Sequence, residues 1–551
     1  MAFSTCFLLV ALSYIPSTCG DIRPRPLSWS ANSYGPDGPW QAVAIQLGTP
    51  PQSINLYPGG AWESLILGSS VCNESSTCLA QNAGVYDRSK SSTAITVTAA
   101  NYVYNQTFDG TQNLTGSGSY ILDQMLVSPV EGYLTDAVPS FDMFVVDQAF
   151  SILADGTEYP AEVGNLALGA PLANQTFGSF NGTLITSYLY ANGLTPSNSF
   201  GLHIGSAQLG IAGSLYLGGY DQLRIVGPVS AQSYTNAILQ LDLLDIGIGV
   251  AEGGSPFPYT SKSGLLAQGS SSINGFIPVE TDPKEPYLYL PVSTCQAIAQ
   301  ELPVTFQPKY GLYLWNTTDP RYQQIITSPS YLAFTFRANN SISQNFTINV
   351  PFALLNLTLR APITDTPTPY FPCSLPRLPD YRLGRAFLQA AFVGMNWGVD
   401  YQGTWFLAQA PGPNIGLAPS VQSIAPTDNF IISSQNKWAD SWSKTWTPLP
   451  GSTIIPTGTQ STSPSPSVPT IPTKSLAPGA IAGISVGIIV VIALVSGVAW
   501  ILFRRRGRKP EVAEREKNHP DQTISLQQKP ELDGGPGPYD RSELPSHELP
   551  G

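Results

Sequence analysis

Charged side chains are scarce in this 551-residue chain, where Asp, Glu, Lys and Arg together make up 11% of the sequence. The net charge is −11, and the one dense basic cluster, residues 504–509, adjoins an apolar segment. Because phosphate binding needs clustered Lys and Arg, this distribution argues against a nucleic-acid partner. Gly and Pro number 50 each and aromatic residues reach 10%, which favours many short strands over long helices.

Histidine is also scarce, and His203 is the only one outside the C-terminal segment that holds His519 and His547. A Ser-His-Asp arrangement would have this single candidate base, and no Gly-x-Ser-x-Gly motif accompanies it. We interpret His203 as a packed or partly exposed strand residue. One histidine and scattered acids are also a poor basis for a metal site, and no cofactor is expected.

Two apolar runs near the ends of the chain suggest targeting to a membrane. Residues 1–20 resemble a secretory signal peptide, and residues 480–503 are long enough to cross a bilayer before the basic residues 504–509. The expected topology is type I in the plasma membrane or a secretory-pathway membrane, with an extracellular or lumenal ectodomain. Residues 416–479 are expected to form a Ser/Thr/Pro-rich stalk, and residues 504–551 a disordered cytoplasmic tail.

Cysteine is limited to six residues, two of which, Cys6 and Cys19, fall in the predicted signal peptide. The other four indicate two disulfides and formally allow three pairings. Their spacing favours Cys72 with Cys78, which leaves Cys295 for Cys373. Nine Asn-x-Ser/Thr sequons predict a heavily glycosylated ectodomain, and they begin at Asn73, Asn105, Asn113, Asn174, Asn181, Asn316, Asn339, Asn345 and Asn356.

Aspartate is missing where one motif would require it. Gly48-Thr49-Pro50-Pro51-Gln52 resembles the opening strand and turn of the pepsin-like aspartic proteases (peptidase A1), which carry a catalytic Asp-Thr-Gly triplet a fixed distance downstream. Counted without gaps, the triplet falls on Gly59-Gly60-Ala61. No Asp lies between Asp37 and Asp87, and the two acids in that interval, Glu63 and Glu74, lie beyond the triplet.

Four further blocks resemble the same family in the expected order and spacing. They are Tyr-Asp-Arg-Ser-Lys-Ser-Ser-Thr at 86–93, Gly-Asn-Leu-Ala-Leu-Gly at 164–169, the paired segments 199–202 and 213–221, and Leu-Gly-Arg-Ala-Phe-Leu at 383–388. The chain is most similar to fungal, membrane-anchored, aspartic-protease-like proteins. The resemblance implies a mostly β, bilobal, barrel-like fold with a central cleft, in which a lead over 21–39 precedes lobes at 40–230 and 231–415.

The second catalytic triplet of the family corresponds to Asp282-Pro283-Lys284, counted back from the segment that ends at Pro291. Asp282 would therefore be the remnant of a catalytic motif. Pro283 has no backbone N–H for the carboxylate and no hydroxyl for a hydrogen bond between lobes. Asp before Pro also commonly starts a turn, which is the alternative interpretation of this segment.

The chemistry of the family makes these losses severe. Aspartic proteases use two carboxylates that share one proton, and a single carboxylate cannot be acid and base at once. By analogy with triad deletions, losing one member of such a unit lowers turnover by about 10⁴- to 10⁶-fold. The flap departs as well, because Thr115 precedes Gly116-Ser117-Gly118-Ser119 and Tyr120 follows it. Residues 21–39 also leave little room for a prosegment.

Three functions are compatible with these observations. The first is a single-pass cell-surface glycoprotein with a catalytically inactive peptidase A1 domain, whose cleft binds a peptide or cell-wall ligand. The second is a weak or unconventional aspartic-type endopeptidase, in which Asp282 works with another carboxylate within about 4 Å. The third is an adhesion or signalling receptor whose stalk and tail are the working parts.

Overall fold

The computed structural model of this chain describes residues 22–451, apart from 60–62, 73–77, 98–105, 109–113, 128–134, 170–173, 178–179, 235–239, 340–342, 376–380, 400–401 and 417. Residues up to Ile455 form one compact unit, and a second unit from Pro456 onward lies outside the described residues. The predicted signal peptide, apolar segment 480–503 and cytoplasmic tail therefore also lie outside them. Within the described part, no helix is long and apolar enough to span a bilayer.

The described residues form five sheets, which confirms the prediction of a mostly β protein. The largest sheet has twelve strands from the first part of the chain. Its central path runs β12 (Asn174–Phe177), β13 (Phe180–Thr183), β9 (Ala137–Ile152), β5 (Ser64–Leu67), β11 (Gly164–Leu166), β4 (Gln52–Pro58), β3 (Trp40–Leu47), β8 (Leu114–Val127) and β6 (Ile95–Thr96), with β2 (Trp29–Tyr34), β7 (Gln106–Phe108) and β10 (Glu158–Pro160) paired beside it.

An eight-stranded sheet and a four-stranded sheet belong to the later part of the described chain. The first contains β25 (Asn345–Pro351), β24 (Ser330–Arg337), β18 (Gln240–Val250), β20 (Ile277–Thr281), β29 (Tyr381–Leu383), β21 (Leu288–Tyr289) and β28 (Cys373–Ser374), with β19 (Ser261–Lys262) beside β18. The second contains β22 (Val304–Gln307), β23 (Leu312–Trp315), β27 (Thr368–Phe371) and β26 (Leu357–Leu359). Strict alternation of buried and less buried residues along β24 shows how one face of a strand enters the core.

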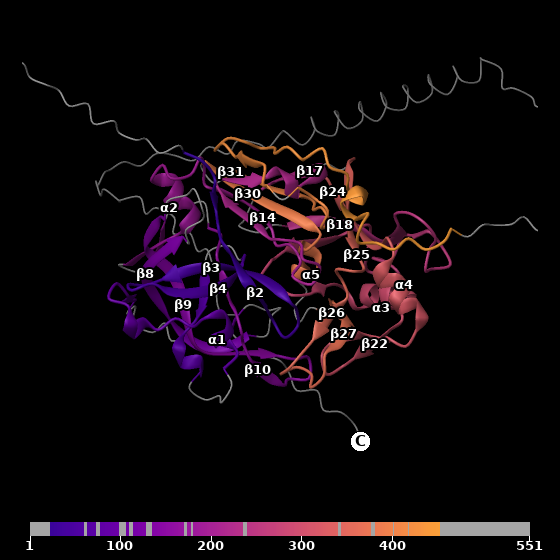
Figure 1. Ribbon diagram of the computed structural model, residues 1–551, viewed down its shortest axis with the longest axis horizontal. Coiled ribbons are helices and arrows are strands. Elements are labelled where there is room, and N and C mark those ends of the chain that lie inside the picture. The colour runs from indigo at the N-terminus through magenta and orange to yellow at the C-terminus, as the bar shows by residue number, and fades with distance from the viewer. Residues whose placement is uncertain are drawn as a thin grey trace, which may run out of the picture. The chain divides into compact units, whose positions relative to one another are not determined.

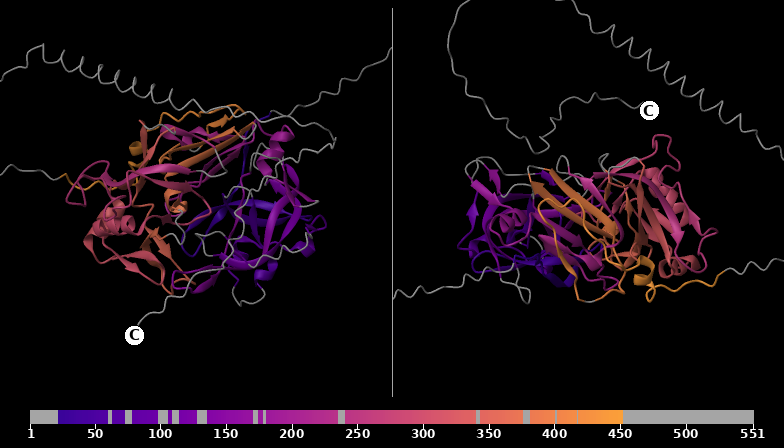
Figure 2. Two further views of the ribbon diagram at one scale, coloured as in Figure 1. Left: turned by 180° about the vertical axis from the view of Figure 1, so that it is seen from behind. Right: turned by 90° about the horizontal axis from the view of Figure 1, so that it is seen from above.

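A six-stranded sheet combines strands from distant parts of the chain and lies between the other large sheets (Figures 1 and 2). Its order is β1 (Arg25–Pro26), β15 (Ser214–Leu217), β14 (Ser199–His203), β30 (Ala391–Val399), β31 (Gln402–Gln409) and β17 (Val226–Ser233). The remaining pair joins β16 (Gly219–Asp221) to β32 (Val421–Ser423). This pair joins the C-terminal part of the folded chain to residues 219–221 in its middle.

Helices are short among the described residues. The α-helices are α1 (Ala80–Ala83), α2 (Ile185–Ala191), α3 (Val292–Glu301), α4 (Pro320–Thr327), α5 (Arg385–Leu388) and α6 (Trp438–Trp442), and the 3₁₀ turns are η1 (Ser69–Cys72), η2 (Arg88–Lys90) and η3 (Gln222–Arg224). The two disulfides join Cys72 to Cys78 and Cys295 to Cys373. The favoured pairing is therefore confirmed.

The folded unit extends beyond the point where the stalk was expected to begin. Instead of ending near residue 415, the chain forms β32 and α6, and Trp442 and Trp446 are buried. These two rings stack with centroids 5.4 Å apart, and Gly412 donates its N–H to the Ser441 hydroxyl at 2.7 Å. The aromatic residues between 438 and 446 give this segment enough apolar surface to pack, whereas a stalk has none.

Candidate functional site

The first motif segment leaves the sheet at the end of β4. Pro58 is paired in parallel register with Leu166 of β11, and the next residue, Gly59, donates its N–H to the Leu166 carbonyl at 2.9 Å. Strand β5 then returns antiparallel to β11. Strands β4 and β5 therefore lie on the two sides of the short strand β11.

The second motif segment repeats this arrangement in the eight-stranded sheet. Thr281 at the end of β20 is paired in parallel register with Leu383 of β29, and Asp282 donates its N–H to the Leu383 carbonyl at 3.2 Å. Strand β21 returns antiparallel to β29, as β5 does to β11. Residues 59 and 282 consequently occupy equivalent positions in two copies of one strand-loop-strand pattern.

The two loops touch at Gly59 and Pro283. A Cβ atom placed on Gly59 would lie 2.9 Å from the Pro283 Cβ and 3.1 Å from its Cγ and Cδ. Gly59 also has a φ angle of +144°, a conformation that side chains other than glycine rarely adopt. The space into which a side chain at position 59 would extend is thus taken by the proline ring.

Asp282 is nearly buried, and its carboxylate faces cations. Its Oδ1 accepts the Lys284 N–H at 3.0 Å, while its Oδ2 lies 3.7 Å from the Lys284 ammonium and 3.5 Å from the Arg382 guanidinium. Arg382 also lies within 3.5 Å of the Glu280 carboxylate and 3.7 Å of that of the buried Glu285. The Asp282 carboxylate therefore forms ion pairs with two cations.

Arg385 fastens the second loop to the first part of the chain. This buried guanidinium donates to the Pro283 carbonyl at 3.2 Å and to the Lys284 carbonyl at 2.5 Å. It also lies over the rings of Tyr57, at 4.1 Å, and Trp40, at 5.0 Å. The Arg385 guanidinium thus contacts the second loop through hydrogen bonds at its edge and the first part of the chain through stacking of its face, and it holds together this junction between the loops of Gly59 and Pro283.

The opening motif docks on the segment 86–93. The Thr49 N–H donates to the Ser91 hydroxyl at 3.0 Å, and the Ser92 N–H donates to the Thr49 carbonyl at 2.8 Å. Behind them, Asp123 accepts hydrogen bonds from the Tyr86 hydroxyl at 2.5 Å and the Thr93 hydroxyl at 2.6 Å. Two of the blocks that carried the family resemblance are therefore adjacent in space.

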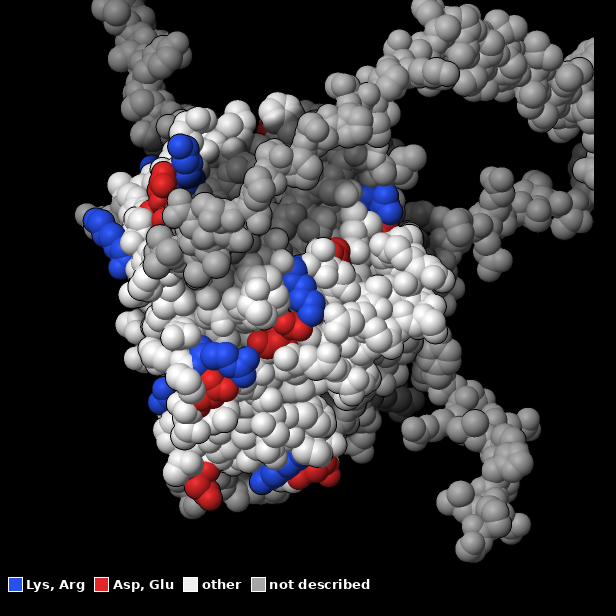
Figure 3. Space-filling view, turned by 90° about the vertical axis from the view of Figure 1, so that its right-hand side faces the viewer, with Lys and Arg blue, Asp and Glu red and all other residues white. Residues whose placement is uncertain are grey.

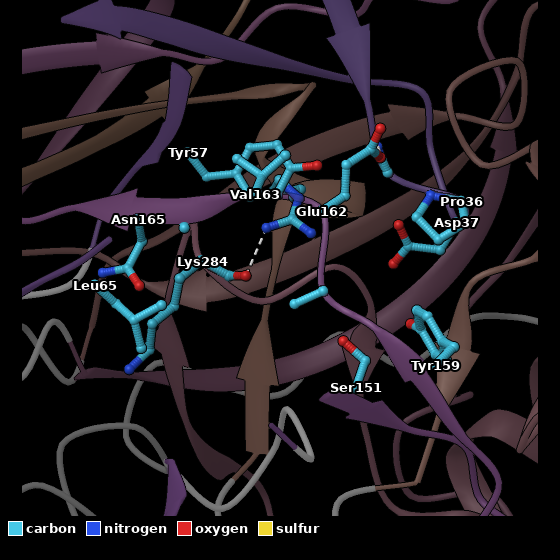
Figure 4. Close-up of a pocket in the computed structure, with 14 residues that line it drawn as sticks. Pro36, Asp37, Tyr57, Leu65, Ser151, Tyr159, Glu162, Val163, Asn165 and Lys284 are labelled. Atoms are coloured by element: carbon cyan, nitrogen blue, oxygen red, sulfur yellow. Dashed lines mark hydrogen bonds between the residues drawn. The ribbon is translucent and has the colours of Figure 1, made fainter. Parts of the chain in front are cut away.

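A small polar cavity lies beside this junction, with Lys284, Leu65 and Asn165 at one end and Asp37 at the other (Figure 4). Its volume is about 60 Å³, which corresponds to roughly two water molecules. Asp37 accepts the Trp40 indole N–H at 3.0 Å, and Glu162 accepts the Gly35 N–H at 2.7 Å. The cavity suits bound water better than a peptide side chain.

Two acids that carried no role in the motif comparison lie near the first loop. The Tyr120 hydroxyl donates to Glu63 Oε2 at 3.3 Å, and burial raises the Glu63 pKa to about 7 despite this bond and the charge of Lys284. Burial, with a smaller contribution from the Glu63 charge, raises the Asp142 pKa to about 8. Sequence reasoning noted Glu63 only as an acid beyond the triplet and missed Asp142, because no motif signals its burial.

The other singled-out residues have varied environments. His203 is fully buried in β14 and its Nε2 bonds to the Gln389 carbonyl at 2.9 Å, and burial lowers its pKa to about 3. Thr115, Gly116 and Tyr120 follow one another along a single continuous strand, β8.

Among the sequons, Asn181, Asn316, Asn339 and Asn345 are exposed and Asn356 is half-buried. Asn174 lies in β12, while Asn73, Asn105 and Asn113 lie outside the described residues.

The described surface agrees with the scarcity of charge. On the face shown in Figure 3, charged side chains are sparse and most basic groups lie next to acidic ones.

No protein-family model matches this chain, and no curated protein matches it.

Proposed function

We propose that this protein is a catalytically inactive member of the pepsin-like aspartic protease fold, displayed on a cell surface, whose cleft region binds a peptide or cell-wall ligand. In this proposal, the twelve-stranded sheet belongs to one lobe, the eight- and four-stranded sheets belong to the other, and the six-stranded sheet joins them. The repeated strand-loop-strand pattern around Gly59 and Asp282 supports that assignment.

One observation carries the loss of catalysis. The two equivalent loop positions hold a glycine packed against Pro283 and an aspartate that faces Lys284 and Arg382. Hydrolysis by this chemistry needs two carboxylates close enough to share a proton and to hold a water molecule between them. The Pro283 ring takes the space of a side chain at position 59, and Lys284 and Arg382 face the Asp282 carboxylate. Neither the shared proton nor the site for the water molecule is therefore provided.

The alternative of an unconventional endopeptidase receives less support. It requires a second carboxylate facing Asp282 across the junction, whereas the Asp282 carboxylate forms ion pairs with Lys284 and Arg382. Asp142 does not fill the role, because it is 1% exposed and could not reach a substrate. The receptor hypothesis concerns the stalk and tail, most of which lie outside the described residues.

A proteolysis assay tests the proposal. The full-length protein, incubated with a broad peptide library between about pH 3 and 7, should release no fragments detectable by mass spectrometry, because position 59 supplies no carboxylate to share a proton with Asp282. Asp282→Ala provides the matched control and should give the same background as the wild type. Pepstatin-sensitive cleavage that disappears in Asp282→Ala would refute the loss of catalysis.

Ligand binding needs a separate measurement. The same library and soluble cell-wall polysaccharide fragments are passed over the immobilised full-length protein, with Lys284→Glu as a variant that reverses one charge beside the junction. Retention by the wild type that the variant loses is the expected result. If neither probe is retained by the wild type, the cleft does not bind these two classes of ligand, and that part of the proposal fails.

A further inference from the structure

Asp142 is a buried acid of the described chain whose carboxylate lacks hydrogen bonds. It lies on β9 with 1% of its surface exposed, and neither carboxylate oxygen has a hydrogen-bond partner among the described residues. Strand β13 seals it, since a Cβ added to Gly182 would lie 2.7 Å from both the Cβ and the Cγ of Asp142. An ionised carboxylate in such a place would be strongly destabilising.

Glu63 is its neighbour across the β5–β9 pair. Ser64 is in parallel register with Met143, so the residues that precede them, Glu63 and Asp142, are adjacent on one face. Two carboxyl groups side by side bind a proton more tightly than either would alone, because the second negative charge is disfavoured.

We propose that Glu63 and Asp142 form a proton-binding carboxyl pair that stabilises the β5, β9 and β13 region of the sheet while protonated and loosens it when the protons leave. This inference does not depend on the proposed function. It assigns a response to pH to two residues that lie outside the segments 59–61 and 282–284.

The charged and titratable groups around the pair set the order of proton loss. Glu63 receives the Tyr120 hydroxyl from β8 and is influenced by Lys284 from the segment after β20, and both favour its ionised form. Asp142 faces Glu63 from β5, and β13 (Phe180–Thr183) brings no charged side chain. Glu63 therefore ionises first, and Asp142 keeps its proton to higher pH.

The direction of the stability change follows from the raised pKa values, about 7 for Glu63 and about 8 for Asp142 against ordinary values of 4.5 and 3.8. Between these limits the folded protein holds protons that the unfolded chain has lost, so its stability falls as pH rises. Above about pH 6.5, ordinary carboxyl groups no longer titrate in either state. His203 still loses its proton near pH 6.5 in the unfolded chain alone, so it acts in the opposite direction and raises the stability as pH rises.

The test compares thermal unfolding of the full-length protein at pH 6.5 and pH 9, followed by tryptophan fluorescence. The wild type should lose about 3 °C or more in Tm on going to pH 9. Asp142→Asn keeps the shape without the proton that titrates at this residue, and it should remove most of the slope and leave the part that comes from Glu63. Glu63→Gln should remove part of the slope.

Asp123 supplies the matched control, because it is equally buried in the same sheet but accepts hydrogen bonds from Tyr86, Thr93 and the Gln124 N–H. Asp123→Asn should lower Tm by a similar amount at both pH values and keep the wild-type slope. If Asp142→Asn does not fold, the infrared carbonyl band of a protonated carboxyl group should be present in the wild type at pH 6.5 and lost at pH 9.

Three results would overturn the inference. One is a wild-type pH slope that persists in both Asp142→Asn and Glu63→Gln. Another is the absence of any protonated carboxyl band at pH 6.5. The third is a rise of the wild-type Tm at pH 9 on addition of CaCl₂ that Asp142→Asn does not show, because the pair would then hold a cation and not a proton.

Discussion

Gly59 combines two constraints that a larger residue would violate, its positive φ angle and its contact with Pro283. We expect Gly59→Asp to lower the free energy of unfolding by about 1–3 kcal/mol and to confer no proteolysis. The carboxylate at Asp282 would still face Lys284 and Arg382, so no shared proton would result. Urea unfolding and the peptide-library assay at about pH 4 measure both effects.

A double variant separates the two constraints at this position. Gly59→Asp with Pro283→Gly removes the ring but keeps the backbone strain, so its destabilisation should be smaller than the sum of the two single changes. Gly59→Ala combined with Pro283→Gly isolates the backbone conflict, because in the presence of Pro283 the alanine Cβ would also meet the proline ring. Additive effects of the two substitutions would show that residues 59 and 283 do not interact.

Spacing along the sequence is enough to find residues in equivalent backbone positions, but not residues whose environment depends on burial. Counting along the sequence singled out Gly59 and Asp282, and the structure gives both the same N–H bond to a leucine carbonyl. The environment of Asp142 depends on β13 closing over it from a segment some forty residues later. No sequence motif around residue 142 indicates that contact.

At the scale of elements, the segment after residue 415 is the clearest departure from the sequence interpretation. Its Ser/Thr/Pro-rich composition suggested a stalk over 416–479, but three tryptophans spaced four apart, Trp438, Trp442 and Trp446, pack together. Helix α3 begins at Val292, directly after Pro291, and the Thr294 hydroxyl in its first turn donates to the Leu266 carbonyl at 2.7 Å.

Truncation tests the role of that segment. A chain that ends at residue 451 should unfold at the same urea concentration as the full-length protein, because no described contact is lost. A chain that ends at residue 415 should lose about 3 kcal/mol or more, since Trp442 and Trp446 leave the core. Equal stability of the two truncated chains would show that the segment packs without contributing to stability.

At the scale of the whole folded unit, the six-stranded sheet should make unfolding cooperative. Strand β14 pairs with β30, so hydrogen bonds join residues near 200 to residues near 395. Thermal unfolding of the full-length protein should therefore give one transition for the region 22–451, with coincident midpoints from circular dichroism and tryptophan fluorescence. Two resolved transitions would mean that the large sheets unfold independently.

This long-range pairing also marks the limit of prediction at the largest scale. The Gly, Pro and aromatic content predicted many short strands, and pairing Cys72 with Cys78 left Cys295 for Cys373, as the structure has them. The pairing of β1 with β15 joins residues 25–26 to residues 216–217 and depends on the folding of everything between them. Local patterns specify strands, but the partner of each strand is a property of the complete chain.

Under the proposed relationship to active proteases, the contact between Gly59 and Pro283 has an evolutionary consequence. Restoring an acid at position 59 is unfavourable while the proline remains, and replacing the proline alone restores no function on which selection could act. Each change therefore blocks the benefit of the other. Descent from an active ancestor would be a one-way passage at this junction, and a lineage that carries both residues would retain its new role even if proteolysis again became useful.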